Sequence, residues 1–210
     1  MVDNMSEKAS LLPLPEELYL RSLTGRLVGE NLFDGFKKVA VITYPDRICS
    51  AMASSALTSF SYYTGYKDRI GAVFVYDENL RSEVRKIVDE NFDAVYIAFG
   101  GEQKLSIVNQ ATIETLKLLR DSGYKNALAI HVRIWLATKQ FSTVLSDESL
   151  RRWLESLPEI RVFTADLNNK KFLFHRVRIV DGKPVLNTFR EALLTDEHVS
   201  LLKRSIPPPE

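Results

Sequence analysis

The chain has 210 residues, 45% of them hydrophobic and 26% charged, as is usual for a globular protein with one sizeable core. Its formal net charge of +1 gives no overall electrostatic reason to expect a nucleic-acid partner, although a local basic patch stays open. The single cysteine, Cys49, excludes an internal disulfide framework and a cysteine-based zinc site.

The amino-terminal sequence and the hydropathy of the chain predict a cytoplasmic protein. The first ten residues, MVDNMSEKAS, are polar and lack the apolar core of a signal peptide. No run of about 18 apolar residues is present, so we expect no membrane-spanning segment and no membrane partner. We expect residues 1–210 to form a single domain, with flexible ends at residues 1–12 and 206–210.

Buried strands alternate with helices through the first two thirds of the chain. A short helix begins at Leu14, with proline and acidic residues in its first turn. Apolar runs such as VAVIT and AVYIAF predict strands that are covered on both faces, as in a parallel sheet. The pattern predicts a doubly wound α/β domain with a mainly parallel sheet. Its predicted elements are strand Val39–Thr43, helix Ile48–Tyr63, strand Gly71–Tyr76, helix Leu80–Asn91, strand Ala94–Phe99, helix Leu105–Asp121 and strand Ala127–Ile134.

The last third of the chain has a different pattern, which predicts a β-hairpin and a final helix. The hairpin turn is Asp181-Gly182-Lys183, a sequence that favours tight turns between strands. The predicted elements are helix Ser146–Leu157, strand Ile160–Thr164, hairpin strands Lys171–Val180 and Pro184–Phe189, and helix Thr195–Arg204.

Polar corners follow three of the predicted strands, at the edge of a parallel sheet where ligands usually bind. The corner at Asp46 precedes a helix of small side chains, which either packs closely on the sheet or brings its backbone to an anion. Gly100-Gly101 is either a phosphate cradle or a plain turn, and His131 lies in the corner of the fourth predicted strand, where a lone histidine is more often structural than a ligand. The fingerprints of Rossmann and P-loop nucleotide sites are both absent.

The remaining metal and nucleophile candidates are weaker. Glu102-x-Lys104, with Asp93 upstream, matches the end of a restriction-type nuclease pattern, but the glycine pair ends the strand before Glu102. His175 and His198 have no ligand spacing to His131, which argues against zinc. Cys49 lies in an apolar helix and is interpreted as a small core residue.

Taken together, the corners resemble the motifs of the DHH phosphoesterase superfamily, to which the RecJ exonucleases belong. The stretch VAVITYPDRICSAMASSA follows the outline of a strand, His-x-Asp-x-Asp-Gly and a small-residue helix. Asp93 to Gly100 takes the place of the motif with a single aspartate, and Ile130-His131-Val132 that of Asp-His-His. The resemblance covers residues 36–135 and implies a DHH-like form of the α/β fold.

Departures from the family pattern imply that hydrolysis has been lost. Asp46 is the one aspartate left of the first motif, Ala98 stands at the place of the single aspartate, and only His131 remains of the triplet. The family's two-metal centre, usually manganese, needs several carboxylates. Asp46 and His131 are therefore interpreted as remnants, with no catalytic residue, no metal and no cofactor. No counterpart of the family's second, substrate-binding domain follows.

The resemblance implies a role in DNA replication. The eukaryotic cell-division-cycle forty-five protein is a RecJ-like relative without metals, and it works in the replicative helicase with the MCM ring and the GINS complex. This chain resembles inactive archaeal RecJ-like counterparts. The expected function is that of a non-enzymatic helicase subunit at the replisome, which binds GINS directly and the MCM helicase indirectly.

Two other functions stay open from the residues themselves. One is a metal-dependent phosphoesterase or nuclease, with its ligands among Asp46, Asp77, Asp93, His131 and Asp166. The other is an α/β domain that binds a small molecule such as a nucleotide at the corners of Asp46 and Gly100-Gly101.

Two groups of residues are candidates for contact with single-stranded DNA, because aromatic and basic side chains can stack on bases and follow phosphates. The first group lies near the end of the second helix and comprises Tyr62, Tyr63, Tyr66, Lys67 and Arg69. The second lies on the hairpin and comprises Lys171, Arg176 and Arg178. An amphipathic helix end and a charged edge strand account for the same residues.

Overall fold

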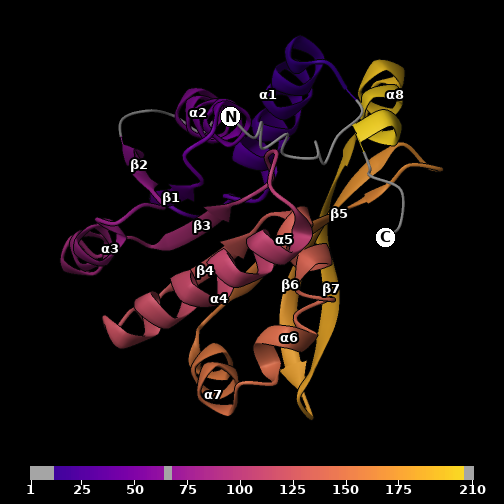
Figure 1. Ribbon diagram of the computed structural model, residues 1–210. Coiled ribbons are helices and arrows are strands. Elements are labelled where there is room, and N and C mark those ends of the chain that lie inside the picture. The colour runs from indigo at the N-terminus through magenta and orange to yellow at the C-terminus, as the bar shows by residue number, and fades with distance from the viewer. Residues whose placement is uncertain (1–11, 64–67, 206–210) are drawn as a thin grey trace, which may run out of the picture.

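A seven-stranded sheet and eight helices make up the described part of the chain, residues 12–63 and 68–205 of the computed structural model (Figure 1). The strands are β1 (Lys38–Thr43), β2 (Ile70–Val75), β3 (Ala94–Ala98), β4 (Ala127–Ile130), β5 (Ile160–Asp166), β6 (Lys171–Val180) and β7 (Lys183–Leu193). Their order in the sheet is β2-β1-β3-β4-β5-β6-β7. The first five strands of this order are parallel, and β6 and β7 extend the sheet in antiparallel fashion.

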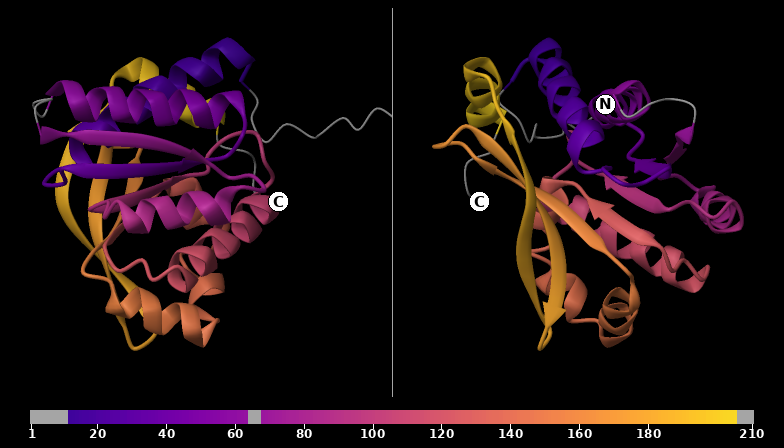
Figure 2. Two further views of the ribbon diagram at one scale, coloured as in Figure 1. Left: turned by 90° about the vertical axis from the view of Figure 1, so that its left-hand side faces the viewer. Right: turned by 180° about the vertical axis from the view of Figure 1, so that it is seen from behind.

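Helices cover both faces of the sheet. They are α1 (Leu14–Asn31), α2 (Arg47–Tyr63), α3 (Leu80–Asp89), α4 (Leu105–Asp121), α5 (Val132–Ala137), α6 (Ser142–Leu145), α7 (Glu148–Ser156) and α8 (Asp196–Ser205). α1, α2 and α8 pack on the face that carries Val41 and Tyr96. α3, α4 and α7 pack on the face that carries Ile42 and Ile97. Figure 2 shows the helical layers on the two sides of the sheet.

The central strands are apolar throughout because both of their faces are buried. Neighbouring residues of a strand point to opposite faces, and in β1 and β3 they enter the two separate core clusters. The register places Thr43 beside Ala98 and Ile97 beside Ile130, so the loops after β1, β3 and β4 leave the sheet at one edge. This carboxyl edge is where the three polar corners meet.

The predicted α/β fold with a mainly parallel sheet is confirmed, and α4 and β6 have the bounds predicted for them. In the described part of the chain, no helix is both long enough and apolar enough to cross a bilayer. The cytoplasmic location and the single-domain organisation stay predictions. The expected flexibility of residues 1–11 and 206–210 falls outside the described residues.

Two expectations about local structure were wrong, and one helix was missed. The first helix is not short, because α1 runs for 18 residues. The strand expected over Ala127–Ile134 ends at Ile130, and α5 begins at Val132. An apolar run of this length does not distinguish a strand from a buried helix. The short helix α6 was not expected from the sequence.

α2 packs on the sheet through small residues such as Ala53 and Ala56, and it also lies in close contact with α1. A Cβ atom added to Gly29 of α1 would lie 2.1 Å from the carbonyl oxygen of Ala56. One added to Gly25 would lie 2.6 Å from the carbonyl oxygen of Met52. The predicted packing of this helix on the sheet is therefore present, and α1 is a second, closely packed partner. The contact also positions α1 over the carboxyl edge of the sheet.

Candidate functional site

Asp46, in the corner after β1, binds two other parts of the carboxyl edge. Its Oδ1 accepts a hydrogen bond of 2.7 Å from the backbone N–H of Cys49, which caps the first turn of α2. Its Oδ2 accepts one of 2.8 Å from Nε2 of Gln103. A carboxylate at a helix N-terminus is stabilised by the free N–H groups there. The anion position that the sequence suggested for a ligand is thus occupied by a side chain of the protein.

Gly100 and Gly101 allow the three corners to close on one another. A Cβ atom at Gly101 would lie 2.5 Å from Oδ2 of Asp46, and one at Gly100 would lie 2.6 Å from Cε1 of His131. The backbone N–H of Gly100 also lies 3.3 Å from Sγ of Cys49. These contacts favour a tightly packed turn over a phosphate cradle.

His131 is a buried, neutral side chain that points one donor into the interior. Its Nδ1 accepts a hydrogen bond of 3.0 Å from the backbone N–H of Arg133, so the ring proton lies on Nε2. Its pKa is held well below its usual value, mainly by burial and further by Arg21 and Arg133. No described residue accepts a hydrogen bond from Nε2.

Two buried arginines approach His131 from different elements. Arg133 follows β4, and its Nη2 donates a hydrogen bond of 2.6 Å to the carbonyl oxygen of Gln103. Arg21 comes from α1, where it forms an ion pair of 3.2 Å with Glu17. Their side chains are only 6% and 7% exposed, Arg21 being the more buried. Burial, with Arg21 as a second influence, lowers the pKa of Arg133 to about 10, which leaves it charged at pH 7.

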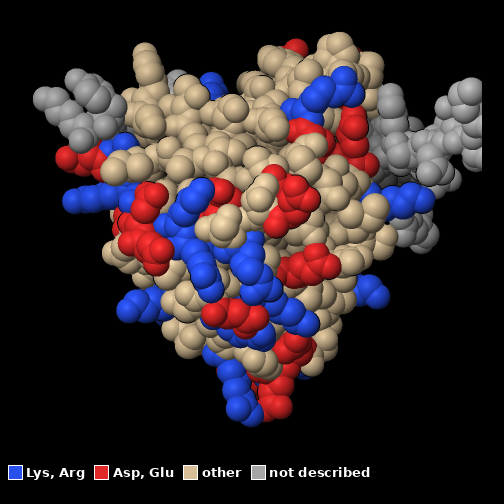
Figure 3. Space-filling view, turned by 60° about the vertical axis from the view of Figure 1, so that its left-hand side comes forward, with Lys and Arg blue, Asp and Glu red and all other residues tan. Residues whose placement is uncertain are grey.

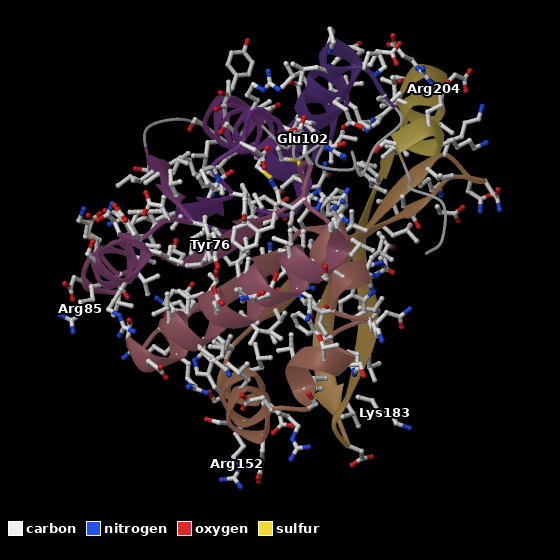
Figure 4. The ribbon with its side chains drawn as sticks, in the orientation of Figure 1. Tyr76, Arg85, Glu102, Arg152, Lys183 and Arg204 are labelled. Carbon is white, nitrogen blue, oxygen red and sulfur yellow. The ribbon has the colours of Figure 1, made fainter. Side chains whose placement is uncertain are left out.

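These side chains form what we call the carboxyl-end cluster: Glu17, Arg21, Tyr96, Gln103, His131 and Arg133. Burial is the main cause of the pKa shifts of Tyr96, His131 and Arg133, and in all three Arg21 acts to lower the pKa. The positive charge of Arg21 therefore acts on all three groups. Glu102, which precedes Gln103 in the loop after β3, is exposed, and Figure 4 labels it beside α1.

Five buried atoms of the carboxyl-end cluster have no hydrogen-bond partner within residues 12–63 and 68–205. They are Nε of Arg21, Oη of Tyr96, Oε1 of Gln103, Nε2 of His131 and Nε of Arg133. Four of the five carry a proton to donate, and one can only accept. Because buried polar groups in native proteins are nearly always paired, with protein or with ordered water, these donors require acceptors, which ordered water or a bound group with acceptor oxygens can supply.

Sequence reasoning found only part of this cluster. Asp46 and His131 were singled out, and the structure brings both to the carboxyl edge. Arg133, two residues after His131, was given no role, and Arg21 and Tyr96 were missed. The signal that was present is the Glu17–Arg21 spacing of four residues on a helix, which favours an ion pair. The depth at which that pair is buried becomes visible only in three dimensions.

The carboxylates proposed as metal ligands are spread over the molecule. Asp93 lies at the opposite edge of the sheet, where its Oδ2 accepts hydrogen bonds from the backbone N–H groups of Lys37 and Lys38. Asp166 lies in the β5–β6 turn and binds Asn169. Among the described residues, no three His, Cys, Asp or Glu side chains are placed to share a metal ion. The alternative function left open above, a metal-dependent phosphoesterase, therefore finds no such group of ligands among the described residues.

The two groups of candidate DNA contacts do not form one surface. Tyr62 is 78% exposed at the end of α2, and Arg69 lies over the ring of Phe60 at 5.2 Å. Tyr66, Lys67 and the side chain of Tyr63 fall outside the described residues. The first group lies between α2 and β2, and β2 is one edge of the sheet. The second group lies on β6, which is next to the opposite edge strand, β7.

Acidic partners neutralise much of the basic surface. On the hairpin, Lys171 pairs with Glu191 and Arg176 with Glu159, each at 2.6 Å, while Arg178 is exposed. Figure 3 shows Lys and Arg interspersed with Asp and Glu on the face that it presents. The ion pairs of α3, α4 and α7 repeat this pattern: Lys86–Glu83, Lys117–Asp147 and Arg152–Glu148.

Buried neutral histidines predict a loss of stability in acid. Burial, with Arg26 and Arg21 nearby, lowers the pKa of His198 from 6.5 to about 4. The unfolded chain takes up this proton near pH 6.5 and the folded chain only near pH 4. The free energy of unfolding is therefore highest above about pH 6.5. Between pH 6.5 and pH 4 it decreases by at most about 1.4 kcal/mol per pH unit.

Urea unfolding at pH 7 and pH 5 measures this loss. His198→Gln removes the titrating ring and keeps a group that can bind Thr24, the present partner of His198 at 3.1 Å. We expect a shallower decline with pH in this variant than in the wild type. An unchanged decline would contradict the assignment of the acid sensitivity to His198.

Solved structures similar to this chain come from bacterial receptors and from LpoA. One is a putative branched-chain amino acid ABC transporter from Rhodospirillum rubrum, with 18% identity and a TM-score of 0.48 over 69% of this chain and 37% of that one. Another is an extracellular ligand-binding receptor from Verminephrobacter eiseniae, with 10% identity and a TM-score of 0.43 over 72% and 37%. A third is full-length LpoA from Haemophilus influenzae, with 10% identity and a TM-score of 0.45 over 77% and 27%.

The chain aligns with only about a third of the length of these proteins, and likeness at this level assigns no activity to it. The prediction of a replicative helicase subunit that binds GINS directly and the MCM helicase indirectly was nevertheless wrong. The solved structures named here are a putative amino acid ABC transporter, an extracellular ligand-binding receptor and LpoA, described as a regulator of PBP1A, and none of these is a replication protein. The resemblance to the DHH superfamily itself stays untested.

Sequence comparisons give the family of the chain. A search of curated protein sequences finds no match. A family model described as "Uncharacterized protein" matches residues 17–201, which include all three corners and the carboxyl-end cluster. The chain therefore belongs to this family.

Proposed function

We propose that this domain binds a small anionic molecule, one with a carboxylate or phosphate group, at the carboxyl-end cluster. The observation that carries the proposal is the set of buried donors without partners, the Nε atoms of Arg21 and Arg133 and Nε2 of His131. An anion has the acceptor oxygens that these donors require. The site also lies where parallel α/β sheets usually bind ligands.

The buried guanidinium groups of the cluster favour an anion over a neutral ligand. Arg21 and Arg133 are buried beside Glu17, whose own pKa is raised, chiefly by burial. Asp46 supplies a second negative charge, which raises the pKa of Arg133, but its two oxygens bind Cys49 and Gln103 and not the Nε donors. A buried donor without an acceptor costs about 1–3 kcal/mol, and the oxygens of a bound anion remove that cost through charge-assisted hydrogen bonds.

The ligand enters only when the cover of the site moves. Apart from the half-buried Gln103, the residues of the cluster are buried; Glu17 and Arg21 lie on α1, and Gln103 lies in the loop that begins at Gly100. Binding therefore selects a conformation in which α1 or this loop is displaced. A small ligand fits this arrangement better than a polymer does.

Thermal unfolding of the full chain in a panel of solutes tests the proposal. The panel contains inorganic phosphate, sugar phosphates, dicarboxylates and neutral amides of matched size. A ligand present at 100 times its Kd stabilises the folded state by about 2.7 kcal/mol, which raises the Tm by roughly 5 to 10 °C for a domain of this size. We expect at least one anion to do this and the neutral amides to have no effect. Equal responses to the amides and the anions would contradict the proposal.

We also propose that the domain acts by binding rather than by catalysis. Burial, with Asp46 nearby, raises the pKa of the Cys49 thiol to about 12, so no thiolate nucleophile is populated at neutral pH. His131 is neutral, and its Nδ1 is engaged by the backbone of α5. Turnover of a bound anion by the full chain, if lost on His131→Ala, would contradict this part of the proposal.

A further inference from the structure

Two segments border the carboxyl-end cluster and are candidates for the movement that ligand entry requires. One is α1, which carries Glu17 and Arg21. The other is the stretch of residues 100–104 between β3 and α4, which we call the β3–α4 loop and which carries Gln103. Figure 4 labels Glu102 of this loop beside α1. The contacts of each segment indicate which of the two opens more easily.

α1 is fixed by apolar packing, by α2 and by α8. Its side chains Leu20 and Val28 are fully buried. Gly29 lies so close to α2 that an added Cβ atom would be 2.1 Å from the carbonyl oxygen of Ala56. Side chains of α1 also bind α8 in three pairs, Thr24–His198 at 3.1 Å, Tyr19–Glu197 at 3.0 Å and Glu16–Arg204 at 2.8 Å. Displacement of α1 breaks these contacts and exposes a large apolar area.

The β3–α4 loop is held mainly by one polar side chain. Nε2 of Gln103 donates a hydrogen bond of 2.8 Å to Asp46, and the carbonyl oxygen of Gln103 accepts one of 2.6 Å from Arg133. The N–H of Gly100 lies 3.3 Å from Sγ of Cys49, which is a weak acceptor. The loop sequence, Gly-Gly-Glu-Gln-Lys, contains no apolar side chain. Segments with few buried apolar contacts open at a lower free energy than a packed helix does.

The start of the loop combines a fixed anchor with a flexible backbone. Phe99 is fully buried, and its ring packs edge-on against Tyr44 and Tyr76, at centroid distances of 5.8 and 5.3 Å. The next two residues, Gly100 and Gly101, have the backbone freedom of glycine. The loop therefore swings on its glycines while β3 stays in the sheet.

The loop lies directly against buried donors of the cluster. A Cβ atom added to Gly100 would be 2.6 Å from Cε1 and 3.1 Å from Nε2 of His131, so the loop backbone lies on the imidazole ring. Withdrawal of Gly100 therefore uncovers His131 and the thiol of Cys49. Withdrawal of Gln103 frees Nη2 of Arg133.

We propose that the β3–α4 loop is the gate of the carboxyl-end cluster, with Gln103 as its latch, and that α1 stays in place when the gate opens. Gln103 ties the corner after β1 to the start of α5, because it binds Asp46 on one side and Arg133 on the other. The inference rests on the proposed function for the purpose of opening. The opening itself occurs without a ligand, since a ligand shifts a conformational equilibrium that already exists.

Cys49 is a natural reporter of the gate. It is the single cysteine of the chain, it is 1% exposed, and it lies beside Gly100. Reaction with N-ethylmaleimide requires its exposure, so the labelling rate of the full chain without ligand measures opening. We expect this rate to be almost constant at low urea, because the urea dependence scales with the surface exposed. A steep dependence at low urea, as displacement of α1 or global unfolding requires, would overturn the proposal.

The gate and the proposed function fail separately. Labelling as expected, together with no response of the Tm to any anion of the panel, would support the gate and contradict anion binding. A response to an anion, together with labelling of Cys49 only through global unfolding, would support anion binding and overturn the gate.

Three variants of the full chain test the latch through the same labelling rate. Gln103→Ala should raise the rate at least about tenfold, as the loss of a hydrogen bond to a carboxylate does. Glu102→Ala, at an exposed neighbour in the loop, is the matched control and should stay within about twofold of the wild type. Tyr19→Phe removes a bond between α1 and α8 and should also leave the rate unchanged. Urea unfolding verifies that each variant is folded. Equal rates in Gln103→Ala and the wild type would overturn the proposal, as would a tenfold rise in Tyr19→Phe.

Discussion

Replacing Gly29 with alanine is expected to destabilise the protein by about 3 kcal/mol, as large overpacking changes do. A Cβ atom at this position would lie 2.1 Å from the carbonyl oxygen of Ala56 and 3.0 Å from the backbone nitrogen of Phe60. Both neighbours are backbone atoms of α2, which cannot rotate away as a side chain would. The two helices must separate, and the core beneath Phe60 loses contact.

Whether Gly29→Ala lowers or raises the free energy of unfolding distinguishes the close packing of α1 and α2 from an ordinary helix interior. In an ordinary helix interior, alanine in place of glycine stabilises a protein by about 1 kcal/mol. Urea unfolding measures the change, and Ser54→Ala on the exposed face of α2 is the control, expected within about 0.5 kcal/mol of the wild type. A more stable Gly29→Ala variant would show that α1 and α2 do not pack as closely as described.

Replacing Arg133 with methionine is expected to weaken the binding of the anion about 100-fold, the cost of one or two charged hydrogen bonds. Methionine keeps the length of the apolar stem and removes the guanidinium. The change also relieves the repulsion between Arg133 and Arg21, which lowers the pKa of Arg133 in the native protein. The folded state without ligand should therefore change little in stability, while the rise in Tm with the anion is lost.

Arg152→Met is the matched control for this variant. Arg152 is exposed on α7, where it pairs with Glu148. It should keep the full response to the anion. Equal responses of the two variants would place the binding site elsewhere on the protein.

The sheet and most of the helices were predictable because burial on two faces leaves a continuous apolar run. β1, β3 and α4 follow from this pattern, and β6 and β7 follow from the turn at Asp181-Gly182. The end of β4 was not predictable, because Ile134 and Trp135 are as apolar in a buried helix as in a strand. It is the cap by His131 that ends the strand and begins α5.

The candidate site was only half visible in the sequence. Asp46, Gly100 and His131 could be named as site residues because each follows the end of a predicted strand. The ends of neighbouring parallel strands lie at the same edge of the sheet. Nothing in the sequence places Arg21 there, because α1 precedes the sheet and its position depends on Gly25 and Gly29. Asp93 was named as a possible metal ligand, but it lies at the opposite edge of the sheet from Asp46 and His131.

The Nε–H resonances of the arginine side chains provide the most direct test of the central claim. Arg21 and Arg133 should give slowly exchanging signals, because their Nε atoms are buried. Titration of the full chain with the anion selected from the panel should shift both signals in a saturable way and leave that of the exposed Arg152 unchanged. Saturable binding that leaves the signals of Arg21 and Arg133 in place would contradict the assignment of the site.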